Sequence, residues 1–134
     1  MPFGRFAKFV VVGGVGFVID AGVLTLALRE LTSSIYAARA LSFGSAVLAT
    51  WLLNRLFVFD VDTRRSLVAE YGRYFVTQTA GALSNLAVFV ALIELMPRLA
   101  AAPVVPLAVG AALGALVNYA GSAVWVFNAR RSNR

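Results

Sequence analysis

Four apolar runs, each about 20 residues long, are the feature that most constrains the fold of this chain. They cover residues 9–28, 37–56, 74–95 and 104–127. A helix needs about 20 mostly apolar residues to cross the roughly 30 Å hydrocarbon layer of a bilayer. Each run is therefore predicted to be a transmembrane helix, and the predicted fold class is all-α with four spans.

The composition supports a membrane environment and excludes several functions. Of the 134 residues, 60% are hydrophobic and 13% are charged, whereas an ordinary soluble domain is about 25% charged. The chain has no Cys and no His, which removes disulfides, thiolate nucleophiles, histidine bases and the usual zinc ligands. We predict one transmembrane domain over residues 1–134, with no metal, no cofactor and no catalytic residue.

The positive charges are divided unequally between the two ends of the predicted spans. One side carries only Arg29, Arg39 and Arg98. By the positive-inside rule, the more basic side faces the cytoplasm, which places both termini and the 57–73 loop there. The net charge of +6 falls in short clusters between the apolar runs, so an anionic membrane surface is predicted as the partner, not nucleic acid. The more basic side carries nine cations: Arg5, Lys8, Arg55, Arg64, Arg65, Arg73, Arg130, Arg131 and Arg134.

The two halves of the chain, about 5–60 and 70–130, resemble each other. In the first helix of each half, an offset of 65 places Gly16 on Gly81 and Asp20 on Asn85. This predicts two tandem helical hairpins that form a parallel repeat about an axis along the membrane normal. The alternative is that any two membrane hairpins share such statistics. In the second helix the offset is 68, and Ser42, Ala46, Thr50 and Asn54 fall on Gly110, Gly114, Asn118 and Ser122.

Four polar residues, one on each predicted helix, lie at a similar depth near the middle of the bilayer. Asp20 follows Phe9 by 11 residues, or about 16 Å of helix, and a carboxylate there costs roughly 2.5–3.5 kcal/mol. Such residues can line a wet cavity; alternatively, they form interhelical hydrogen bonds worth about 0.6 kcal/mol each. The other three residues of this layer are Thr50, Asn85 and Asn118.

Two arginines complete the set of candidate binding residues. Arg39 and Arg55 lie at opposite ends of the second span, where a guanidinium can hold a lipid phosphate through paired hydrogen bonds. Alternatively, either side chain extends to the interface, or Arg39 pairs with an acid such as Glu94. The predicted substrate-binding residues are Asp20, Arg39, Thr50, Asn54, Arg55, Asn85, Asn118 and Ser122.

Three motifs give the chain a family resemblance that covers nearly its whole length. They are the opening segment 5–13 followed by Asp20, the segment 52–59 (LLNRLFVF), and its second-half echo 118–127 (NYAGSAVWVF). In this order and spacing, they resemble the GtrA-like family of small bacterial membrane proteins. The family often has Asn where this chain has Thr50, which weakens any claim that an amide is needed at that position.

The resemblance implies a protein of the bacterial plasma membrane that translocates polyprenyl-phosphate-linked sugars, such as undecaprenyl-phosphate glucose, for cell-surface polysaccharide synthesis. It implies a sugar-lipid substrate and a glycosyltransferase partner. Because four helices enclose little volume, we also expect a homo-oligomer surrounded by membrane lipids.

Two other functions remain open. A non-transporting scaffold could recruit a glycosyltransferase through the basic 64–73 segment. A small multidrug exporter also has four helices and an acid in its first span, but the nine-to-three division of cations argues against it.

Overall fold

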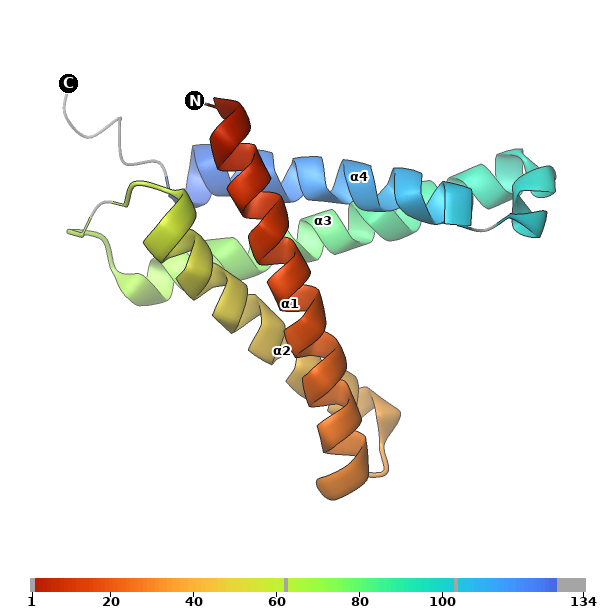
Figure 1. The fold of residues 1–134 in the computed structure, drawn as a ribbon, viewed down its shortest axis with the longest axis horizontal. Helices are drawn as coiled ribbons and strands as arrows, with labels where there is room; N and C mark the ends of the chain where they lie inside the picture. Colours follow the sequence, from red (N-terminus) through yellow and green to blue (C-terminus); the bar gives the residue numbers. More distant parts are fainter. Residues whose placement is uncertain (1, 62, 103, 128–134) are drawn as a thin grey trace. The chain divides into compact units, whose positions relative to one another are not determined.

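The computed structural model describes residues 2–61, 63–102 and 104–127, and within those residues all regular secondary structure is helical, with short turns between the helices (Figure 1). The long helices are α1 (Pro2–Glu30), α2 (Ile35–Leu53), α3 (Leu67–Leu95) and α4 (Val104–Gly121). With their continuations, all four are long and apolar enough to cross a membrane. The prediction of an all-α protein with four candidate spans is therefore confirmed. Pro103, Arg130, Arg131 and Arg134 lie outside the described residues.

The chain divides between Arg64 and Arg65 into two compact units. In the N-terminal unit α1 packs against α2, and in the C-terminal unit α3 packs against α4. Each unit is an antiparallel pair of helices, because the start of one helix contacts the end of the other: Phe9 meets Phe59 and Tyr74 meets Phe127.

In the N-terminal unit, a short polar turn separates the two helices. The Ser34 backbone N–H donates to Thr32 Oγ1 at 3.0 Å, and Ser34 Oγ accepts from the Ala37 N–H at 3.3 Å. Ser34 is therefore the N-cap of α2, and it satisfies one of the backbone donors that a helix start leaves without an intrahelical partner.

In the C-terminal unit, α3 begins well before the apolar run that it contains. Ser66 caps α3 by accepting from the Ala69 N–H at 3.4 Å, and Glu70 lies in the first turn. The polar segment that the sequence placed between spans is thus partly helical, because a helix needs no apolar residues where it leaves the bilayer. After α3 a 3₁₀ turn, η2 (Pro97–Ala101), leads to α4. Pro106 lies in the first turn of α4, where its missing N–H breaks no helical bond.

Both second helices end in a π-helix, a feature that the sequence analysis did not predict. These are η1 (Asn54–Val58) after α2 and η3 (Ser122–Val126) after α4. The Phe59 N–H donates to the Asn54 carbonyl at 3.0 Å, and the Phe127 N–H donates to the Ser122 carbonyl at 2.9 Å. π-helical turns are rare and are frequently found at functional sites. The two π-helices differ in position by 68 residues, which is the offset that relates the second helices of the two halves.

Candidate functional site

The N-terminal helix pair is joined inside its apolar span by an ion pair between Asp20 of α1 and Arg39 of α2. Arg39 Nη1 donates to Asp20 Oδ1 at 2.9 Å and to Oδ2 at 3.1 Å, and it lies 3.3 Å from Ser42 Oγ. Arg39 lies one turn into α2, and its guanidinium contacts the Asp20 carboxylate of α1. The sequence suggested Glu94 as an acid for Arg39, whereas the structure pairs it with Asp20.

This pairing gives the span a polar centre that is neutral overall and partly open. The side chains of Asp20 and Arg39 are 24% and 47% exposed, so protein does not enclose the pair completely. Ionisable residues within membrane spans are costly, usually pair with one another, and mark substrate or ion pathways. The pair can therefore hold its own charges and still offer oxygens and N–H groups to a polar ligand.

Thr50, by contrast, uses its hydroxyl within its own helix. Thr50 Oγ1 donates to the Ala46 carbonyl at 2.8 Å and lies 3.2 Å from the Val47 carbonyl. The Thr50 methyl group fills the space above Gly16, where a Cβ would collide with it. The Thr50 hydroxyl is thus bonded within its own helix, and its methyl group packs where the two helices meet.

The C-terminal helix pair brings its two asparagines onto glycines of the opposite helix. The Asn118 side chain lies against Gly81, and the Asn85 side chain lies against Gly110. Asn118 Oδ1 is buried and has no hydrogen-bond partner among the residues that the structure describes. Ser122 Oγ, one turn further along, is in the same situation within the described chain. Buried polar atoms are nearly always satisfied, so each of these two oxygens needs a hydrogen-bond donor that the described chain does not supply.

Asn54 and Arg55 lie apart from the Asp20–Arg39 pair. Both belong to η1, and Arg55 follows Arg39 by 16 residues, which is about 24 Å of helix. Asn54 is almost fully buried, and its backbone carbonyl closes the π-turn with Phe59. The structure therefore brings together Asp20 and Arg39 but places Arg55 at the other end of the helix.

Two contacts between the helices of the N-terminal pair recur at corresponding positions in the C-terminal pair. Under offsets of 65 for the first helix and 68 for the second, Phe9–Phe59 corresponds to Tyr74–Phe127, with ring centroids 6.2 Å and 5.9 Å apart. Gly16 with Thr50 likewise corresponds to Gly81 with Asn118. The offsets could be read from the sequence, but the place of Ser42 beside the Arg39 guanidinium was not predicted. Ser42 corresponds to Gly110, which lies against the Asn85 side chain. This correspondence was the sequence signal that placed Ser42 near the polar residues of its own helix pair.

These features define a multi-pass membrane protein whose spans carry paired and unsatisfied polar groups. The sequence matches the family described as GtrA/DPMS, transmembrane domain, over residues 8–127. The chain therefore belongs to this family, which confirms the resemblance. The family is generally non-catalytic and is tied to the handling of polyprenyl-phosphate-linked sugars. No curated protein matches the sequence.

Proposed function

We propose that this protein is a translocase that moves a polyprenyl-phosphate-linked sugar across the bacterial plasma membrane for cell-surface polysaccharide synthesis. The observation that carries the proposal is the Arg39–Asp20 ion pair within a membrane span. Family membership supplies the class of substrate.

The chemistry of the polar groups suits a sugar in transit. A hexose crosses hydrocarbon slowly because its hydroxyls lose their hydrogen bonds to water. The Asp20 carboxylate accepts hydrogen bonds from hydroxyls, and the Arg39 guanidinium attracts the phosphate. In the C-terminal helix pair, taken by itself, Asn118 Oδ1 and Ser122 Oγ are acceptors that no described residue satisfies. The prenyl chain can remain among the lipid acyl chains throughout, so the protein needs to shield only the head group.

Two partners belong to this proposal. A second copy of the chain completes the enclosure around the head group, because four helices enclose little volume by themselves. A glycosyltransferase on the outer side then consumes the sugar lipid.

The direct test uses purified protein reconstituted alone into vesicles that contain a short-chain prenyl-phosphate glucose. Wild-type protein is expected to equilibrate the sugar lipid between leaflets, and Asp20→Ala and Asn118→Leu are each expected to slow this at least tenfold. Thr25→Val is the matched control, because it removes a hydroxyl that bonds to the Ala21 carbonyl of its own helix at 2.8 Å.

Three results would contradict the proposal in different ways. Full transfer by both Asp20→Ala and Asn118→Leu would exclude the polar groups as the pathway. Inert wild-type vesicles, together with loss of surface sugar transfer in cells after charge reversal at Arg64 and Arg65, would instead establish the scaffold function. Proton release from the purified protein on addition of a lipophilic cation would indicate an exporter.

A further inference from the structure

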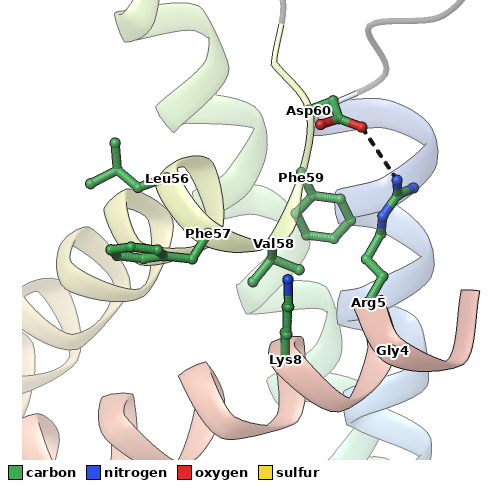
Figure 2. A pocket seen from close by; sticks show the side chains of 8 residues that line it. All are labelled: Gly4, Arg5, Lys8, Leu56, Phe57, Val58, Phe59 and Asp60. Carbon is green, nitrogen blue, oxygen red and sulfur yellow. Dashed lines mark hydrogen bonds and ion pairs between the residues drawn. The ribbon is translucent and has the colours of Figure 1, made fainter. Parts of the chain in front are cut away.

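A second polar site lies at the end of the N-terminal helix pair, away from Asp20 and Arg39. It is a pocket of about 360 Å³ between the first turns of α1 and the η1 segment of the second helix. Figure 2 shows Arg5 and Lys8 projecting from α1 toward Val58 and Phe59, with Asp60 above them. This volume is within the range of small-molecule sites.

Two cations on one face of α1 give the pocket its charge. Arg5 and Lys8 are three residues apart, so their side chains lie on the same side of the helix. The Lys8 ammonium has no hydrogen-bond or ion-pair partner among the described residues. Within the described chain, the Lys8 ammonium therefore keeps its N–H donors for an anion, and Arg5 adds a second positive charge beside it.

Arg5 is held in place by weak contacts that an anion can replace. Its Nη2 lies 3.5 Å from Asp60 Oδ2, and the two side chains are 37% and 84% exposed. Exposed ion pairs of this kind contribute at most about 1 kcal/mol. The Arg5 guanidinium also lies over the Phe59 ring, with Cζ 6.0 Å from the ring centroid, a contact that leaves its N–H groups free to turn toward a phosphate.

The π-helix gives this pocket its mixed lining. Within η1, Val58 is buried, whereas Leu56 and Phe57 are exposed to the surroundings of the helix pair. The rim of the pocket is therefore apolar on the side formed by η1 and cationic on the side formed by the first turns of α1. A ligand that fits both parts has an anionic head group attached to a hydrocarbon chain.

We infer that this pocket binds the phosphate of the prenyl-phosphate sugar, with Arg5 and Lys8 on the phosphate oxygens and the prenyl chain leaving past Leu56 and Phe57. The sugar then lies beside Asp60, whose carboxylate accepts hydrogen bonds from hydroxyls. The identity of the lipid rests on the proposed function, whereas the recognition of a lipid-borne phosphate rests on the pocket itself. The site receives the substrate at one membrane surface, before the head group reaches Arg39.

The test measures equilibrium binding of a short-chain prenyl-phosphate glucose to the full-length protein in phosphatidylcholine nanodiscs. Lys8→Gln and Arg5→Gln are each expected to raise the Kd about five- to tenfold, because each removes one charged donor. Arg29→Gln is the matched control: it removes one cation from the last turn of the same helix, α1, and is expected to leave the Kd unchanged. Phosphatidylglycerol in the nanodisc is expected to compete weakly.

Equal affinity of Lys8→Gln, Arg5→Gln and Arg29→Gln would overturn the inference. Competition by phosphatidylglycerol as strong as that by the unlabelled sugar lipid would also overturn it, by making the site a general phospholipid site. Translocation in the vesicle assay is scored separately on the same proteins. If Lys8→Gln raises the Kd but the wild-type protein does not translocate, the proposed function alone is refuted. If the wild-type protein translocates but Lys8→Gln leaves the Kd unchanged, the pocket alone is refuted.

Discussion

A single charge such as Asp20 or Arg39 is unfavourable inside a membrane, and in this protein each residue compensates the charge of the other. The guanidinium contacts both carboxylate oxygens, at 2.9 and 3.1 Å. When one partner of such a pair is removed, the other charge remains without compensation, whereas removing both can be nearly neutral. The stability of this helix pair should therefore depend on the two residues jointly.

This dependence gives a double-mutant prediction. Asp20→Asn and Arg39→Gln are each expected to lower the free energy of unfolding by about 1–3 kcal/mol, and the double variant is expected to recover most of the loss. The measurement is unfolding of the purified proteins in one detergent. The double variant should nonetheless remain inactive in translocation, since it lacks both charged groups. Losses that simply add would show that the two residues are not coupled.

At the scale of the elements, glycines set how closely the helices approach. A Cβ on Gly114 would lie 2.7 Å from the Gly81 carbonyl oxygen and 3.1 Å from Asn85 Cβ. The nearest atom belongs to the backbone, so it cannot move aside as a flexible side chain would. At Gly13, in contrast, no described atom outside the nearby backbone of its own helix lies within 4 Å of the position that a Cβ would take.

Gly114→Ala is accordingly expected to destabilise the C-terminal helix pair by about 1–3 kcal/mol, because the helices must separate to admit the methyl group. Gly13→Ala is the matched control and is expected to be neutral or slightly stabilising, because Ala favours helix more than Gly. The stability of each variant is measured as its thermal unfolding midpoint in detergent. A Gly114→Ala protein as stable as wild type would mean that α3 and α4 do not meet closely at this residue.

The helices could be predicted from the sequence because the length of an apolar run is itself the signal, and the turn at Thr32 and Ser34 interrupts it. The direction of the Arg39 side chain could not be predicted from the sequence, because a long side chain at a helix end can reach either the membrane interface or the middle of the span. The antiparallel register of α1 on α2 decides it by placing Asp20 within reach. The π-turns were also missed, because apolar periodicity carries no information about which carbonyl the Phe59 N–H selects.

At the scale of the whole molecule, the two helix pairs share contacts, π-turns and offsets, and we propose that they arose as a tandem repeat. In such a repeat both helix pairs would enter the membrane from the same side, so both termini and the segment between the pairs would share one side. On the positive-inside rule, we propose that this side is the cytoplasm. The pocket at Arg5 and Lys8 would then open to the cytoplasm, where the sugar lipid is loaded.

This orientation is testable with single cysteines, because the chain contains none of its own. Ser33→Cys lies in the exposed turn between α1 and α2, and Thr63→Cys lies in the exposed segment between the two helix pairs. In intact cells, a membrane-impermeant maleimide is expected to label Ser33→Cys and to leave Thr63→Cys unlabelled. A permeant maleimide should label both, which controls for reactivity. The opposite labelling pattern would place the Arg5–Lys8 pocket on the outer surface, and the protein would then receive its substrate from outside, contrary to the proposed direction of transfer.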